Sequence, residues 1–150
     1  MKVGIYTISD LKPPYKDLVS EYLKRITLSL KIHEFSVKGN LNEQQLKFKE
    51  SQLLLNAAHP DAYRIVLDER GDELSSQEFS RLFEEVQMNG LPEISFFIGG
   101  AFGHDKSMRE KAHKIIAFGK MTWPHQFIRV MLVEQIYRAQ QIMKGHPYHK

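Results

Sequence analysis

The sequence predicts an α/β domain with a mostly parallel sheet and helices on both faces. Five short β-prone runs alternate with five segments of helical spacing, as parallel strands joined by crossover helices require. The run Glu93–Ile98 is almost wholly apolar, as a strand covered on both faces should be. No repeat, linker or low-complexity stretch interrupts the chain, so we expect one domain over residues 1–150.

Turn and capping residues separate the expected elements. Pro13-Pro14 precedes the first helix, Asn42 and Ser75 or Ser76 cap the second and third, and Pro124 opens the last. Residues 68–72 are read as a polar turn after the third strand. The expected strands are 2–8, 31–37, 62–67, 93–98 and 114–118, and the expected helices are 15–30, 42–58, 75–89, 105–112 and 125–144.

Charge is unevenly distributed along the chain. Residues 1–100 carry 12 Lys+Arg against 15 Asp+Glu, a net charge of −3, whereas residues 101–150 carry 9 against 3, a net charge of +6. A basic final third favours a polyanionic partner on the C-terminal side, and a solvated surface without a partner is the alternative.

Composition excludes several kinds of chemistry. The chain has no cysteine, which rules out disulfides, thiolate metal sites and a cysteine nucleophile. Its apolar stretches are far shorter than a membrane span, and its N-terminal run lacks the features of a signal peptide. We therefore expect a cytoplasmic protein that does not enter a membrane.

A glycine-rich segment follows the apolar strand. Gly99, Gly100 and Gly103 allow positive φ angles and close approach of backbone amides to a ligand. Their spacing fits neither the dinucleotide fingerprint nor the P-loop. The segment is either a ligand-binding loop or a tight connection between a strand and a helix.

A second segment joins the fifth expected strand to the last helix. It contains Met121 and Trp123 outside any regular element, so it could form the wall of a site for a flat heterocycle. A loop that only packs against the core is the alternative. In parallel sheets ligands bind beyond the carboxyl ends of the strands, so the loops after Leu67, Ile98 and Phe118 are the candidate binding loops.

The last helix and the tail carry two further signals. Residues 130–133 are apolar, so this part of the helix should be buried on every side, which a dimer interface would explain. Glu134 and Arg138 have the spacing of a helix-surface ion pair. Residues 146–150 combine aromatic, histidine and lysine side chains, which suit contact with RNA, whereas a frayed end is the alternative.

Taken together, these motifs closely resemble the ribosomal RNA large subunit methyltransferase H family of the SPOUT superfamily. The resemblance covers the whole length and is most specific over residues 97–150. The matching residues are Phe97-Ile98-Gly99-Gly100, Gly103, Met121-Thr122-Trp123-Pro124-His125, Arg129-Val130, Glu134-Gln135-Ile136-Tyr137-Arg138-Ala139 and His146-Pro147-Tyr148-His149-Lys150.

The resemblance implies an enzyme that uses S-adenosylmethionine and no metal to methylate N3 of a pseudouridine in large-subunit ribosomal RNA. It also implies a C-terminal trefoil knot and a homodimer with the active site at its interface. The implied substrate-side residues are His125, Arg129, Tyr148 and His149. The implied cofactor-binding residues are Leu67, Gly99, Gly100, Gly103, Phe118, Gly119, Lys120, Met121, Thr122 and Trp123.

The chain departs from the family pattern at two places. It has Ala101-Phe102 where relatives commonly carry Pro-Glu or Ser-Asn, and Trp123 is larger than the usual Leu or Phe. Neither change removes a group that the reaction needs. A histidine is a suitable base for the N3 proton, and the sequence does not distinguish His125 from His149.

Two other functions stay open on the sequence alone. One is a non-catalytic module that binds nucleotides or RNA, and the other is a knotted methyltransferase with a different RNA target. An assay of methyl transfer to ribosomes distinguishes a non-catalytic module from an enzyme. Mapping of the modified nucleoside distinguishes a methyltransferase with a different RNA target from one that acts on pseudouridine N3.

Overall fold

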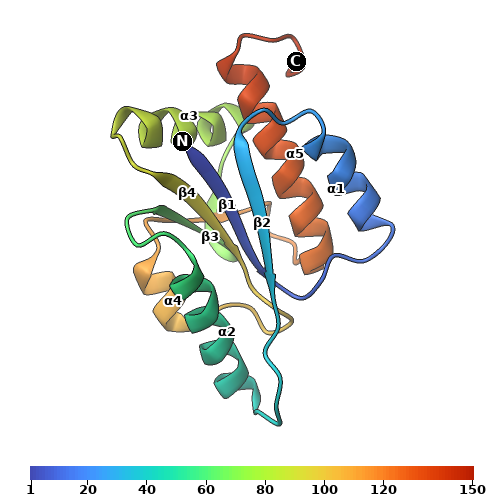
Figure 1. Ribbon diagram of the computed structural model, residues 1–150, viewed down its shortest axis with the longest axis vertical. Coiled ribbons are helices and arrows are strands. Elements are labelled where there is room, and N and C mark those ends of the chain that lie inside the picture. The colour runs from blue at the N-terminus through green and yellow to red at the C-terminus, as the bar shows by residue number, and fades with distance from the viewer.

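Five parallel strands form one sheet in the computed structural model, which describes all 150 residues (Figure 1). The elements are β1 (Lys2–Ile8), α1 (Tyr15–Leu23), β2 (Ser29–Phe35), α2 (Glu43–Ala57), β3 (Tyr63–Glu73), α3 (Ser76–Met88), β4 (Glu93–Ile98), α4 (Lys106–Lys111), β5 (Lys114–Ala117) and α5 (His125–Met143).

The strand order in the sheet is β2-β1-β4-β3-β5, and every neighbouring pair is parallel. All carboxyl ends therefore meet at one edge, and the segment after Leu67 in β3 and the loops that follow β4 and β5 come from neighbouring strands. The predicted parallel α/β fold is confirmed, and this edge is where the fold places a ligand.

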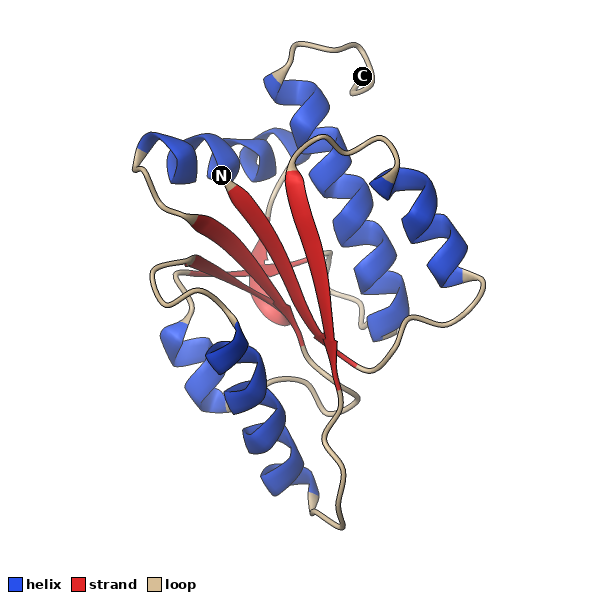
Figure 2. Ribbon diagram, viewed as in Figure 1, coloured by secondary structure: helices blue, strands red, loops and turns tan.

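Helices cover both faces of the sheet, as predicted (Figure 2). One face packs against α1, α3 and α5, with Val19, Phe83 and Leu132 in the core. The other face packs against α2 and α4, through Leu54 and Met108. Since α5 contacts both α1 and α3, it holds the larger layer together.

The first helix is shorter than the spacing predicts. It ends at Leu23 instead of residue 30, and β2 begins at Ser29 instead of residue 31. The amides of Thr27 and Leu28 donate to the side-chain oxygen of Gln140 in α5, at 2.7 and 3.2 Å. These long-range bonds remove the amides from a helical ladder, so the next apolar residues join the sheet.

The third strand is longer than predicted, because the polar turn belongs to it. Pairing of β3 with β5 breaks after Leu67 and resumes at Asp72, so the residues between form an irregular bulge. Gly71 allows the chain to approach β5 again, since a Cβ there would lie 2.6 Å from backbone atoms of Ile115 and Ile116. A polar sequence with a glycine thus continues a strand instead of ending it.

Helix starts agree with the predicted caps. The side chains of Asn42 and Ser75 each accept a hydrogen bond from the amide three residues on, and both form complete capping boxes. Pro124 directly precedes α5. None of the helices combines the length and the apolar composition needed to cross a membrane.

Candidate active site

A cavity of about 750 Å³ opens at the carboxyl edge of the sheet, where the three candidate binding loops converge. This volume lies in the range of small-molecule sites. Of the predicted cofactor-binding residues, Lys120 alone does not line it. Those that do are Leu67, Gly99, Gly100, Gly103, Phe118, Gly119, Met121, Thr122 and Trp123.

The glycine-rich loop is tight enough to require its glycines. The amide of Gly103 donates to the carbonyl of Gly100 at 3.0 Å, which closes a turn with Ala101 and Phe102 at its corner. Gly103 has a φ of +79°, where side chains are strained. A Cβ on Gly100 would lie 2.8 Å from the carboxylate of buried Glu50. The loop therefore brings bare backbone to the cavity.

The loop after β5 forms the opposite wall. The indole nitrogen of Trp123 donates to the carbonyl of Phe118 at 3.1 Å, which fixes the ring. The hydroxyl of Thr122 donates to the carboxylate of Glu69, which joins this loop to the one after Leu67. Met121 and Trp123 remain exposed at the cavity. The arrangement agrees with a wall for a flat heterocycle.

Polar residues that the sequence motifs did not indicate also line the cavity, namely Glu43, Asp68, Glu69, Arg70 and His104. Burial alone would raise the pKa of Asp68, but hydrogen bonds and charge from Arg70 hold it below its usual range. Burial lowers the pKa of His104 to about 4, so this imidazole is neutral. Both follow expected binding-loop positions, Asp68 after Leu67 and His104 after Gly103, and that adjacency was the available signal.

His125, in the first turn of α5, also lines the cavity. Its Nδ1 is buried and has no hydrogen-bond partner. Burial, and secondarily the charge of Arg129, lowers the pKa of His125 below its ordinary value of 6.5. The imidazole is therefore neutral at physiological pH and able to accept a proton.

Arg129 lies one turn further along α5 and is fully buried. Its Nη1 donates to Glu34 at 2.8 Å, and its Nη2 donates to the carbonyl of Ile8 at 3.1 Å. It does not line the cavity. Because Ile8 and Glu34 lie at the ends of β1 and β2, this guanidinium fixes the start of α5 beside the sheet edge.

Tyr148 and His149 lie at the other end of α5. The Tyr148 hydroxyl donates to Glu134 at 3.1 Å, its ring packs edge-on against Tyr137, and Arg138 lies over it. His149 Nδ1 is 3.2 Å from Arg138. The tail is thus held against the helix and is not frayed, and the Glu134–Arg138 pair is part of this contact.

The structure therefore divides the predicted substrate-side residues into two pairs. Residues 125 and 138 are 13 positions apart on one helix, which corresponds to about 20 Å at 1.5 Å per residue. His125 and Arg129 lie at the cavity end of α5, whereas Tyr148 and His149 lie at its tail end. One copy of the chain does not bring the four together.

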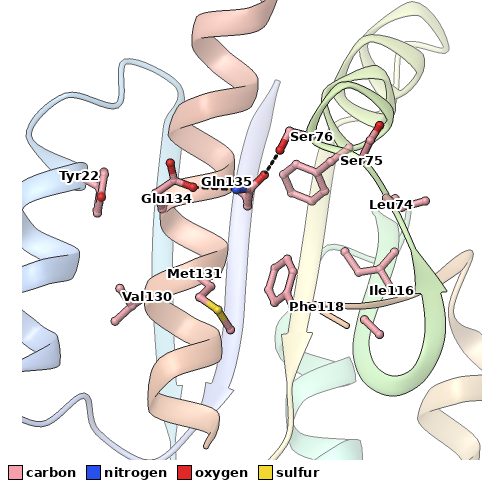
Figure 3. A pocket seen from close by; sticks show the side chains of 12 residues that line it. Tyr22, Leu74, Ser75, Ser76, Ile116, Phe118, Val130, Met131, Glu134 and Gln135 are labelled. Atoms are coloured by element: carbon pink, nitrogen blue, oxygen red, sulfur yellow. Dashed lines mark hydrogen bonds between the residues drawn. The ribbon is translucent and has the colours of Figure 1, made fainter. Parts of the chain in front are cut away.

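A groove of about 420 Å³ runs between α5, α3 and β5 (Figure 3). Val130 and Met131 are half-buried in its wall, so a single chain does not bury residues 130–133 on every side, and their burial in a dimer stays a prediction. Phe118 lines both the groove and the cavity. A group bound in the groove would therefore lie next to the cavity.

The fold and the family comparison define the class of protein. The chain resembles the crystal structure of a probable methyltransferase from Bordetella pertussis Tohama I with a TM-score of 0.59, at 10% identity, over 92% of this chain and 95% of that one. A family model described as "Predicted SPOUT methyltransferase" matches residues 1–149. The class is thus the SPOUT methyltransferases.

Full-length relatives narrow the class. The chain is 41% identical over 151 residues to the ribosomal RNA large subunit methyltransferase H of Rhodospirillum centenum, covering 100% of this chain and 99% of that protein. It is 38% identical to the protein of the same name from Enterococcus faecalis, covering 100% of both. The chain belongs to the ribosomal RNA large subunit methyltransferase H family.

Proposed function

We propose that this protein, as the single domain 1–150, transfers a methyl group from S-adenosylmethionine to N3 of a pseudouridine in large-subunit ribosomal RNA. It acts in the cytoplasm, on the assembled ribosome. The observation that carries the proposal is the convergence of three loops on one cavity with a neutral histidine, His125, in its wall. The names of the full-length relatives support the substrate class.

The cavity suits S-adenosylmethionine in three respects. Its volume accommodates a nucleoside with an amino-acid chain, its glycine loop offers backbone groups without side chains, and Trp123 supplies an aromatic wall. Leu67, the loop glycines and residues 118–123 would hold the cofactor. Asp68 and His104 extend this set with polar groups that the sequence motifs did not indicate.

We also propose that the chain forms a trefoil knot around this site. Residues 118–123 leave β5 at the sheet edge, are joined through Glu69 to the bulge of β3 after Leu67, and continue into α5. That helix lies on the face opposite α4, so the chain crosses from one face of the sheet to the other here (Figure 1), beside the loop after β4 with which it lines the cavity. This path between two loops is the one that a threaded chain would take.

S-adenosylmethionine supplies a methyl group that its sulfonium sulfur already activates. The residues of the chain then align the acceptor and remove the proton from pseudouridine N3. His125 is the base, because it lines the cavity and its lowered pKa keeps it neutral. Arg129 stays charged against Glu34, positions the first turn of α5, and helps to keep His125 unprotonated.

We further propose that two copies form the complete site. The groove beside α5 is the proposed dimer surface, and through Phe118 it adjoins the cavity. Pairing there lets Tyr148 and His149 of one copy serve the cavity of the other, which resolves their separation from His125. Sedimentation of a stable monomer at micromolar concentration would exclude this arrangement.

The central experiment incubates the protein with radiolabelled S-adenosylmethionine and 70S ribosomes, free subunits or naked ribosomal RNA, followed by mapping of the modified nucleoside. We expect label at pseudouridine N3, with intact ribosomes as the best substrate. Binding of cofactor without transfer to any of these would indicate a non-catalytic module. Label on a ribose or on another base would indicate a different target.

A mixing experiment tests whether the tail acts across the dimer. His125→Ala and a variant lacking residues 146–150 are each expected to be inactive. If subunits exchange freely, half of the dimers pair the two variants and contain one intact site, so activity should recover to about a quarter of the wild-type value. No recovery after confirmed subunit exchange would show that the tail acts within its own copy.

A further inference from the structure

The corner of the glycine-rich turn exposes an aromatic ring at the cavity. Phe102 is 50% exposed, lines the cavity and makes no contact with another aromatic ring. Phe127 is also exposed, but its ring packs edge-on against Tyr15. An exposed large apolar side chain that lines a binding site and lacks a partner indicates a contact with something outside the chain.

Hydrogen bonds hold the backbone of the turn that carries this ring. The hydrogen bond from Gly103 to Gly100 closes the turn, and Asp105 donates from its amide to Ser51 in α2 at 3.0 Å. A phenyl ring has two side-chain torsions, so ordering it against a flat partner costs little entropy. Trp123 and Met121 lie exposed on the opposing loop and add apolar surface to the same cavity.

The charge and the aromatic side chains near Phe102 favour an RNA base as the flat group that stacks on its ring. The final 50 residues carry a net charge of +6, and Lys120 is exposed in the loop after β5. The cavity lining itself is mixed, because Arg70 pairs with Asp68 and the carboxylates of Glu43 and Glu69 also line it, so phosphates would meet the basic C-terminal third. Exposed aromatic rings among cations are the combination that binds unpaired nucleic acid, because bases stack on the rings and phosphates meet the charges.

We propose that Phe102 is a stacking platform for an unpaired base of the substrate RNA at the mouth of the cavity. This inference rests on the proposed function and adds a specificity-determining residue to it. A base can reach the cavity only after it leaves its own stack, and a ring at the mouth replaces part of the lost stacking. The contact is made in the bound complex, so it sets affinity for the RNA and leaves the cofactor site unchanged.

The test compares Phe102→Ala with Phe102→Tyr, which keeps the stacking ring. Phe48→Ala is the matched control, because Phe48 is equally exposed at 50% but lies in α2 and does not line the cavity. We measure KM for 70S ribosomes, kcat, and the Kd of S-adenosylhomocysteine by calorimetry.

Phe102→Ala should raise KM by about tenfold, as loss of one stacked base predicts, with kcat and the cofactor Kd within twofold. Phe102→Tyr and Phe48→Ala should match the wild type. A weaker cofactor Kd in Phe102→Ala would assign the ring to the adenine of the cofactor and overturn the proposal, as would an unchanged KM.

Co-sedimentation with ribosomes separates this inference from the proposed function. If the wild type binds 70S ribosomes but transfers no methyl group, the proposed function fails, and the inference stands only if Phe102→Ala weakens co-sedimentation. If the wild type neither binds nor methylates ribosomes, both fail.

Discussion

The cavity end of α5 and the tail that follows its other end are held in different ways. At the cavity end, Arg129 is fully buried and bonds to Glu34 and Ile8, which are 95 and 121 positions away in the sequence. At the tail end, Tyr148 and His149 contact Glu134 and Arg138 of the same helix, 11 to 14 positions away. The fold fixes the cavity end, whereas local contacts alone fix the tail, so the tail can change partners without disturbing the sheet.

The largest expected effect is the loss of cofactor binding when the glycine-rich loop at the cavity is changed. Gly103→Val should abolish binding of S-adenosylmethionine, because Gly103 has a φ of +79° and a β-branched side chain would strain the loop that forms the site. Gly90→Val is the matched control, since Gly90 also has a positive φ and open space around it but lies after α3. Calorimetry should show wild-type affinity for Gly90→Val and none for Gly103→Val.

Gly100→Val should abolish binding for a different reason. Its added side chain would collide with the carboxylate of buried Glu50, so either that carboxylate or the loop would have to shift. Wild-type cofactor affinity in both loop variants would remove the glycine turn from the site.

The second expected effect is the loss of methyl transfer when the tail is removed. Deletion of residues 146–150 should remove methyl transfer to ribosomes, since Tyr148 and His149 are lost, while the cofactor Kd stays unchanged. The melting temperature should fall by only a few degrees, because the lost contacts are three hydrogen bonds to α5, one aromatic pair and one cation–π contact. Full activity of the truncated protein would assign the tail a purely structural role.

The third effect distinguishes the histidines at the two ends. His125→Ala should lower kcat by about 100-fold or more, as expected for loss of a general base. His59→Ala is the control, because His59 lies in the loop between α2 and β3 and contacts Asp61. The measurement is single-turnover methyl transfer at saturating cofactor.

The pH dependence of the wild type sharpens this assignment. The folded pKa of His125 lies below 6.5, so the imidazole accepts a proton above that pKa and loses this ability as pH falls through it. The rate should therefore stay level down to about pH 6.5 and decline at lower pH. A decline already complete at pH 7 would point to a base other than His125.

The smallest effect is on stability at the cavity end. Glu34→Gln leaves Arg129 buried without its counter-charge and should lower the free energy of unfolding by about 2 kcal/mol, less than for a fully buried pair because Glu34 is partly exposed. Glu21→Gln breaks a fully solvated pair with Lys24 and should cost under about 0.5 kcal/mol. Urea unfolding midpoints at neutral pH compare the two, and equal shifts would refute a special role for Arg129.

Much of the fold was predictable from local sequence patterns. The wrongly predicted element boundaries lie where contacts between distant residues determine the secondary structure. The spacing of apolar residues through Ile26 to Leu30 fits a helix, but amide bonds to Gln140 and pairing with β1 place these residues in a turn and a strand. Similarly, the polar run after Leu67 looks like a turn until Gly71 is seen against the backbone of β5. Neither partner is visible in a sequence window.

The site was predictable as far as it is made of loops. Parallel strands put their carboxyl ends at one edge, so the glycine loop and the Trp123 loop were expected to meet. Asp68 and His104 were missed because their roles depend on burial and on neighbours from other elements. The separation of Tyr148 from His125 was predictable from the last helix, since His125 begins it and the tail follows its other end, and 19 residues at about 1.5 Å each set the two ends far apart. The helix side chains that the tail contacts were not predictable from sequence order.

The single tryptophan of the chain makes the cavity optically distinct. Trp123 is the only indole, it lies in the cavity wall, and a hydrogen bond to Phe118 holds it in place. The intrinsic fluorescence of the unlabelled wild-type protein, excited selectively at its indole, therefore originates at the wall of this cavity alone. Stacking of a purine on that ring would quench the emission, so cofactor arrival and departure can be followed in real time by stopped-flow without any mutation or dye.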